Sequence, residues 1–169
     1  EKIEILMKQA GVTPNYSPAR SAALLKEEMT GAPAGAMVLP DGSVVTGKTG
    51  NLLGAASALL MNALKGVSGV DDELYVISDD VLEPICHLKT EHLKSQNPRL
   101  HSDETLLALS ISSVHNPLAA ELIDNADKLR GCDAYFSVII SAADEKLYRT
   151  LGINVCCEPK YEQHRYYHK

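Results

Sequence analysis

Tryptophan is absent from this chain of 169 residues, and phenylalanine occurs once. Apolar residues nevertheless make up 45% of the sequence, so we expect a core that is aliphatic and rich in alanine rather than one built on large rings. This length and apolar content suit one domain with a terminal extension.

Three further absences exclude classes of function. The net charge is −6 with scattered lysines and arginines, and the lack of a basic stripe argues against nucleic acid as a partner. No apolar run approaches the ~20 residues that cross a bilayer, and no signal peptide opens the chain. We therefore expect no membrane partner and a cytoplasmic location. Because the chain opens at Glu1 inside a helical pattern without an initiator methionine, we expect a piece of a longer protein.

Cysteine is also scarce, and its settings exclude a disulfide framework. The four cysteines lie in apolar surroundings, which is typical of small buried hydrophobes in a reducing compartment. Cys86 and His87 would diverge by about 100° on a helix, and His87 and His92 are five residues apart, a poor match to a helical zinc pair. We therefore predict no metal, and we also predict no cofactor. The four are Cys86, Cys132, Cys156 and Cys157.

The most informative motif is the octapeptide Gly-Ser-Val-Val-Thr-Gly-Lys-Thr from Gly42 to Thr49. It fits the phosphate-loop pattern G-x-x-x-x-G-K-[ST], in which consecutive backbone N–H groups curl around an anion ahead of a helix. The residues between the two glycines are mostly β-branched, however, and such residues favour an extended strand.

The residues just before this motif predict a different structure. Leu39-Pro-Asp-Gly-Ser43 is an x-Pro-Asp-Gly-x turn, in which glycine takes the left-handed position. A three-residue hairpin loop would place Leu39 opposite Ser43, and the next two pairs would be Val38 with Val44 and Met37 with Val45. We therefore predict a hairpin over residues 35–46 and no phosphate loop.

A weaker anion site stays open where the second hairpin strand passes into a helix. Thr46, Gly47, Lys48 and Thr49 lie there, and free N–H groups beside a lysine suit an anion. The alternative, which we favour, is an ordinary glycine-rich connection with a solvated lysine. If a ligand pocket exists, we expect Asn116 to complete it from a neighbouring cleft.

Periodicity and end signals predict the remaining elements. Thr49 or Asn51 would cap the helix after the hairpin, and Asp79 or Asp80 would cap a later helix. Pro117 predicts either a kink or two helices with Asn116 as the second cap. The expected helices are 2–10, 17–29, 51–65, 81–94, 103–129 with this interruption, and 142–151, and the expected further strands are 74–77, 135–140 and 153–157.

This order predicts an α/β fold, with a three-layer mixed sheet and helices on both faces. We expect an N-terminal helical extension over residues 1–30, the sheet domain over residues 31–160, and a tail over residues 161–169.

Many sequence blocks resemble one bacterial family, the domain of unknown function 1846. They include Gly31-Ala-Pro-Ala-Gly, the hairpin motif, Asp71-Asp-Glu-Leu, Leu107-Ala-Leu-Ser-Ile-Ser and Leu151-Gly-Ile-Asn-Val, in one order over nearly the whole chain. The resemblance implies the C-terminal domain of a considerably longer protein. The family is uncharacterised, so the resemblance transfers no catalytic residue, and the glycine-rich segment that members carry earlier in their chains is missing here.

The element order also resembles the three-layer layout of cytidine deaminases. Those enzymes open one helix with His-x-Glu and the next with Pro-Cys-x-x-Cys to hold zinc. This chain has Lys48-Thr-Gly-Asn51 and Pro84-Ile-Cys-His87 instead, so deaminase chemistry is excluded and a fold resemblance alone implies no function.

Two functional hypotheses follow from these patterns. The first is an accessory domain that is not an enzyme in isolation and packs on the remainder of its parent protein or forms a homo-oligomer. It predicts an exposed apolar patch. The second is a phosphate or small-ligand pocket at Gly47-Lys48-Thr49, completed by the missing region of a nucleotide-dependent enzyme.

Overall fold

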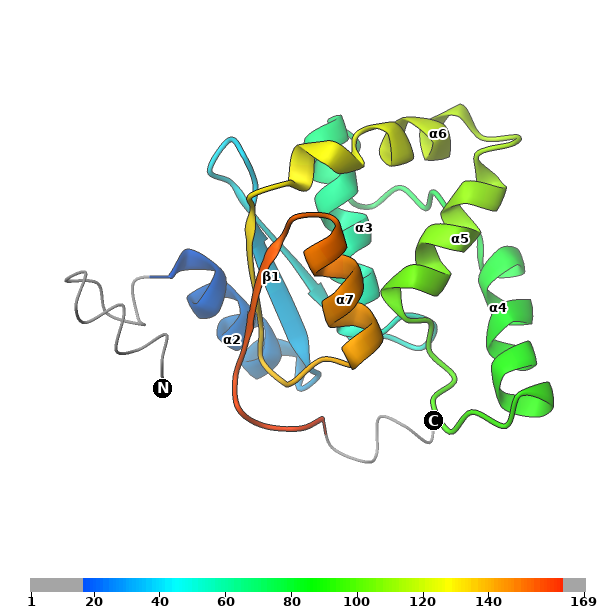
Figure 1. The fold of residues 1–169 in the computed structure, drawn as a ribbon, viewed down its shortest axis with the longest axis horizontal. Helices are drawn as coiled ribbons and strands as arrows, with labels where there is room; N and C mark the ends of the chain where they lie inside the picture. The colour runs from blue at the N-terminus through cyan, green and yellow to red at the C-terminus, as the bar shows by residue number, and fades with distance from the viewer. Residues whose placement is uncertain (1–16, 163–169) are drawn as a thin grey trace.

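The computed structural model describes residues 17–162 and shows a mixed α/β fold (Figure 1). Its four-stranded sheet has the order β2-β1-β3-β4, with antiparallel pairs β1–β2 and β1–β3 and a parallel pair β3–β4. In chain order the elements are α2 (Pro18–Thr30), β1 (Ala34–Val38), β2 (Val44–Lys48), α3 (Ala55–Ser68), α4 (Asp79–His87), the π-helical turn η2 (Leu88–His92), α5 (Ser102–Ser112), α6 (Pro117–Asp124), the 3₁₀ turn η3 (Ala126–Leu129), β3 (Asp133–Phe136), α7 (Ala142–Thr150) and β4 (Asn154–Cys157).

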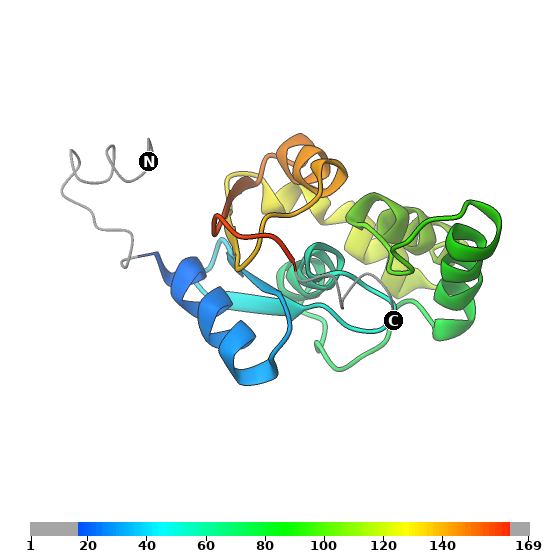
Figure 2. The ribbon, with the colours of Figure 1, turned by 90° about the horizontal axis from the view of Figure 1, so that it is seen from below.

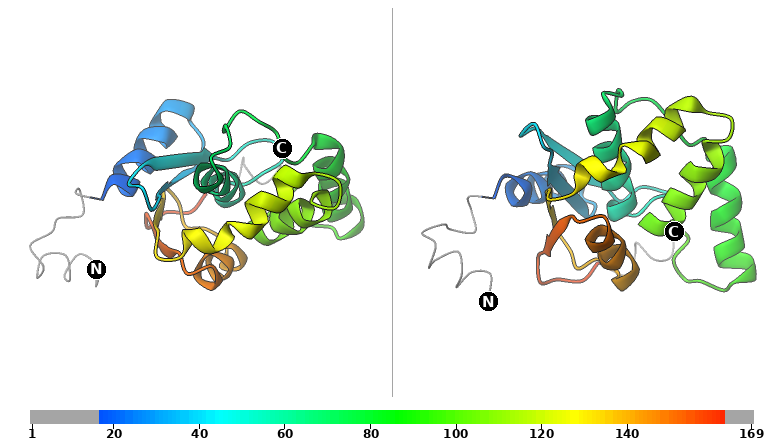
Figure 3. Two further views of the ribbon diagram at one scale, coloured as in Figure 1. Left: turned by 90° about the horizontal axis from the view of Figure 1, so that it is seen from above. Right: turned by 45° about the horizontal axis from the view of Figure 1, so that its top comes forward.

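Helices cover both faces of the sheet, as predicted. Ala36 of β1 packs with Ala19 and Ala23 of α2 on one face, whereas the neighbouring Met37 joins the main core beneath α3 on the other face, because successive strand residues point to opposite sides. Figure 2 shows α2 on one side of the strands and α3 and α7 on the other, and Figure 3 shows the same separation from above. The deaminase-like layout and the domain limits stay predictions.

The predicted start of α2 is confirmed. Ser17 has an extended backbone, and its hydroxyl accepts a hydrogen bond from the Arg20 N–H at 3.3 Å. Pro18 occupies the first turn, where its missing N–H costs nothing. The predicted helix 2–10 lies outside the described residues.

The hairpin is also confirmed, with the predicted register. Met37 pairs with Val45 and Val38 with Val44, and the Leu39 N–H donates to the Ser43 carbonyl at 2.8 Å. The turn closes because Gly42 adopts a φ of +85°, a conformation that residues with a Cβ rarely take.

The predicted strand 74–77 is wrong. Leu74 and Tyr75 are exposed, and Val76 and Ile77 are buried. No strand between residues 17 and 162 pairs with this segment, which is a turn-rich connection to α4. Because only two consecutive side chains enter the core, the apolar run is an anchored loop rather than a strand covered on both faces.

Two predicted helix starts are also wrong. The chain stays extended beyond Asn51, because Leu53 forms a parallel bridge with Leu100, and α3 begins only after Gly54 at its N-cap. Neither Thr49 nor Asn51 caps it. Ser78 is the N-cap of α4, which places Asp79 and Asp80 in its first turn.

Pro117 separates two helices, which is one of the two predicted alternatives. Asn116 is the N-cap of α6, and its Oδ1 accepts a hydrogen bond from the Leu118 N–H at 3.0 Å. Within residues 17–162, no helix is long and apolar enough to cross a membrane.

Candidate functional site

The phosphate-loop pattern is spread along the hairpin and forms no loop around an anion. Gly42 lies in the turn and Lys48 at the far end of β2, and five residues lie between them, which in extended chain corresponds to about 20 Å. A single phosphate group cannot contact both ends of such a strand. The sequence fits the motif, but the backbone conformation excludes the cradle that the motif describes.

Gly47, the second motif glycine, is explained by packing. A Cβ at this position would lie 2.3 Å from the Leu59 backbone N and 2.6 Å from its Cα. Only glycine therefore allows α3 to lie this close to β2. Both motif glycines thus have structural roles, one in the turn and one at the contact with α3.

A half-open groove of about 660 Å³ runs beside β2 and is the candidate ligand site. Thr46, Gly47 and Lys48 line it from the strand, and Asn62 lines it from α3. The Asn62 side-chain amide donates to the Thr46 carbonyl at 2.8 Å. The other lining residues are Lys26, Val44, Val45, Ala58, Gly66, Val70, Asp71 and Asp72.

The other two predicted site residues do not line this groove. Thr49 is buried beyond the end of β2, where its N–H donates to the Pro33 carbonyl at 2.8 Å. Asn116 caps α6, and its side-chain amide donates to the Val76 carbonyl at 3.3 Å. The structure thus brings together Thr46, Gly47 and Lys48, and it assigns Thr49 and Asn116 to backbone hydrogen bonds.

A second polar site, which the sequence patterns missed, surrounds the start of α5. Glu104 Oε1 accepts from the His101 N–H at 2.8 Å and from Lys89 Nζ at 2.7 Å. Burial raises the pKa of Glu104, but hydrogen bonds from His101 and Lys89 outweigh it and lower that pKa to about 2. The hydrogen bond to Glu104 in turn raises the pKa of His101.

The carboxylate of Asp144 in α7 accepts hydrogen bonds at the starts of two helices, α5 and α7. It accepts from the Ser102 N–H at 2.7 Å, from the Ser102 hydroxyl at 2.6 Å, and from the Ser141 hydroxyl at 3.0 Å. The first two bonds cap α5, and Ser141 is the N-cap of α7. These bonds tie α7 to α5 and explain how a carboxylate is tolerated in the interior.

Arg99 is the least satisfied group in this second site. Its side chain is only 5% exposed, its Nε donates to the Gly50 carbonyl, and its Nη1 is buried without a hydrogen-bond partner among the described residues. Burial raises the pKa of the nearby Glu162, and the positive charge of Arg99 opposes that rise. Nothing in the sequence around Arg99 predicts this position, since it follows from the fold bringing residues 50 and 99 together.

The geometry does not favour a metal at this cluster. Ligand atoms lie within 4.8 Å of one another on His101, Asp103 and Glu104. However, Glu104 Oε1 already accepts a hydrogen bond from the Lys89 ammonium. Burial raises the pKa of Cys86, Cys132, Cys156 and Cys157, and such thiols are poor nucleophiles.

Comparison with known proteins gives the family. The model of the C-terminal domain of unknown function DUF1846 matches residues 15–167. A UPF0371 protein of Corynebacterium efficiens is 45% identical over 99% of this chain, and one of Streptococcus thermophilus is 42% identical over all of it. The chain covers 34% of the length of each of these relatives. It therefore belongs to the uncharacterised DUF1846 family and corresponds to the C-terminal domain of its longer members.

Proposed function

We propose that this domain is a non-catalytic accessory module that packs against the remainder of its parent protein. The observation that carries the proposal is a stripe of exposed apolar side chains along α5 and the turn after it. Leu107, Ile111 and Val114 are 65%, 65% and 73% exposed, and their spacing places them on one side of a helix. We call these three residues the α5 stripe.

The rest of α5 explains why the stripe is unusual. Ala108 and Leu109 are buried on the opposite side together with Thr105, so α5 carries apolar side chains on its exposed side as well as on its buried side. A helix of this kind is normally enclosed by protein, and an exposed apolar patch commonly marks an interaction site.

The remainder of the parent is the partner that fits best. The chain covers 34% of its relatives' length, so about two thirds of such a protein lies outside it. A cytoplasmic location is part of the proposal, and it is supported by four cysteines that are all free, as is usual in a reducing compartment.

Cysteine labelling in the full-length parent tests this proposal. Leu107→Cys should react with a maleimide at least about tenfold more slowly than Leu25→Cys if the stripe is covered. Leu25 is a matched control on α2, because it is 55% exposed against 65% for Leu107. Equal rates would contradict the proposal, and a slow rate that recovers on dilution would indicate self-association instead.

A second candidate function is ligand binding in the groove beside β2, since Thr46, Gly47 and Lys48 line a hollow large enough for a small anion. Inorganic phosphate and nucleotides can be titrated against the parent protein and its Lys48→Ala variant, with thermal stability as the readout. Saturable stabilisation that the variant loses would favour ligand binding over a purely accessory role. No shift in either protein would exclude the groove as a phosphate site.

A further inference from the structure

Strand β2 lies at the edge of the sheet and has β1 as its single neighbour there. The Leu39 N–H donates to the Ser43 carbonyl, and beyond the strand the Thr49 N–H donates to the Pro33 carbonyl. Hydrogen-bonded pairs alternate along an antiparallel ladder. The backbone groups of residues 45 and 47 therefore face β1, and those of residues 44, 46 and 48 face away from it.

We call the outward backbone groups of Val44, Thr46 and Lys48 the β2 outer edge. Among the described residues, one contact reaches it, the hydrogen bond from Asn62 to the Thr46 carbonyl. A row of unpaired N–H and C=O groups is a template for another strand. Asn62 occupies one lone pair of one carbonyl, so the three N–H donors and the other acceptors remain available.

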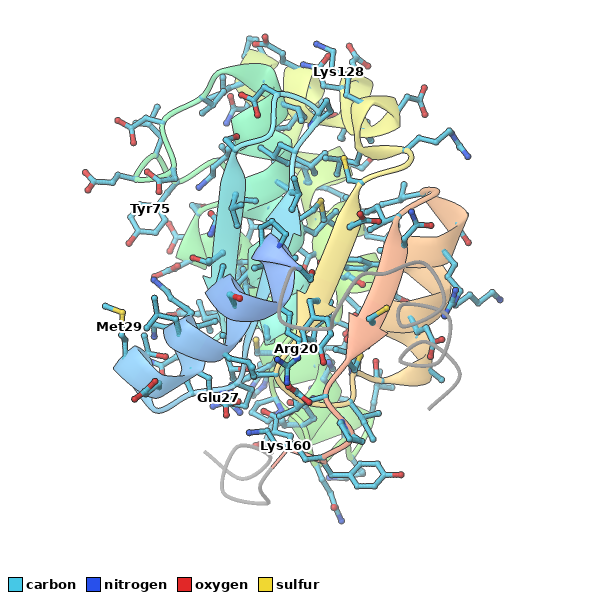
Figure 4. All side chains as sticks on the ribbon, turned by 90° about the vertical axis from the view of Figure 1, so that its left-hand side faces the viewer. Arg20, Glu27, Met29, Tyr75, Lys128 and Lys160 are labelled. Atoms are coloured by element: carbon cyan, nitrogen blue, oxygen red, sulfur yellow. The ribbon has the colours of Figure 1, made fainter. Side chains whose placement is uncertain are left out.

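The β2 outer edge lies within the groove of about 660 Å³, not on a flat surface. Lys26 of α2 lines one wall, and Asp71 and Asp72 line the other. In Figure 4, Tyr75 of the same loop lies on the β2 side of the sheet. About two thirds of the length of the relatives lies outside this chain, so the parent protein itself can supply an extended segment to this groove.

We propose that an extended segment from the part of the parent protein outside this chain adds to the β2 outer edge as a fifth strand. This inference rests on the proposed accessory role and specifies one contact by which the domain would pack on its parent, the addition of a strand to β2. Main-chain hydrogen bonds give such strand addition its affinity, and flanking side chains give it selectivity.

Charges along the groove specify the segment further. Lys48 ends the strand at one end of the groove, whereas a Cβ at Gly66 would lie 3.4 Å from Val45 Cγ1 at the other end. Gly66 leads through a short turn to Asp71 and Asp72. The Lys65 ammonium donates to the Asp72 carbonyl at 3.1 Å and interacts with the charges of Asp72 and Asp71, so a cation already faces these aspartates. An acidic residue placed near Lys48 is therefore the charge match that the groove asks of the segment.

Amide hydrogen exchange in the full-length parent tests the inference. The amides of Val45 and Gly47 pair with β1 and should exchange slowly whether or not a segment binds. If the fifth strand forms, the amides of Val44, Thr46 and Lys48 should also be slowed, by about 100-fold or more relative to an unstructured chain. Fast exchange at these three positions would overturn the inference, and protection lost on dilution would overturn it in favour of a second copy.

Thr46→Pro provides a variant matched to this geometry. The outward Thr46 N–H is not needed by β1, and proline is tolerated on edge strands for that reason. Val44 and Lys48 should then lose protection while Val45 and Gly47 keep it, and Thr46→Val, which retains the N–H, should behave like the parent. If proline disrupts the whole hairpin, the exchange rates in the unsubstituted parent still decide.

Labelling at Leu107 separates this inference from the accessory role on which it rests. A slow maleimide reaction at Leu107 together with fast exchange at the β2 outer edge would overturn the fifth strand alone. Fast reaction at Leu107 would contradict the role of the α5 stripe whatever the exchange result.

Discussion

Replacing Gly47 with alanine should destabilise the domain strongly, although it adds one methyl group. The new Cβ would lie 2.3 Å from the Leu59 backbone N, 2.6 Å from the Leu59 Cα and 2.7 Å from the Ala58 carbonyl carbon. All three are backbone atoms of α3, so no side-chain rotation relieves the clash. The helix must instead move away from β2 by about 1 Å to reach normal contact distances.

The expected loss follows from the cost of overpacking a core. Inserting a methyl group into a tight core costs about 1–3 kcal/mol and sometimes more, and we expect about 3 kcal/mol here because backbone must shift. For a domain of this size that corresponds to a fall in Tm of about 6–12 °C. Urea unfolding should show the same loss of unfolding free energy as a lower midpoint concentration of urea, provided that the dependence of that free energy on urea concentration is unchanged.

Gly50→Ala, one residue beyond the motif, is the matched control. A Cβ at Gly50 meets no atom within 4 Å, so its Tm should stay within a few degrees of the unsubstituted domain. If Gly47→Ala melts no lower than Gly50→Ala, the close approach of α3 to β2 is wrong. The structural explanation of the second motif glycine would then fail with it.

Three further outcomes test the polar interior. Lys89→Met should cost about 3 kcal/mol in urea unfolding, because it leaves the half-buried carboxylate of Glu104 without its cation. Since the pKa of Glu104 is lowered to about 2 from 4.5, its contribution to stability should be complete above about pH 4.5 and be lost as the pH falls toward 2. That loss amounts to about 3 kcal/mol in thermal melts across this range, and a flat acid profile would refute it. Tyr148→Phe should cost about 1–2 kcal/mol, because its hydroxyl donates to the Ala56 carbonyl at 2.6 Å in the core, whereas Tyr161→Phe at an exposed position should leave the Tm unchanged.

Local signals were sufficient wherever neighbouring residues determine the conformation. The turn at Pro40-Asp41-Gly42 and the register of the hairpin were predictable because turn type fixes strand pairing. Helix α2 and the division at Pro117 were predictable because proline and capping side chains act within one turn.

Most of the errors depend on whether segments distant in sequence meet in the fold, whereas the N-cap of α4, which is Ser78 and not Asp79 or Asp80, is a local error. The start of α3 is delayed because Leu53 pairs with Leu100. The apolar run before α4 is a loop because none of the four described strands pairs with it. The site around Arg99 was missed because Gly50, which accepts a hydrogen bond from its side chain, reaches it only after folding.

The two proposed contact surfaces constrain how a parent protein could engage this domain. Helix α3 contacts both β2 and α5 and lies between them (Figure 1), so the α5 stripe and the β2 outer edge face different directions. Two helix diameters separate them by at least about 20 Å, a distance that needs at least about six or seven residues of extended chain. A segment that paired with the five residues of β2 and also reached α5 would therefore need about twelve residues. A globular partner resting on the α5 stripe could also supply the fifth strand through an extended arm of that length.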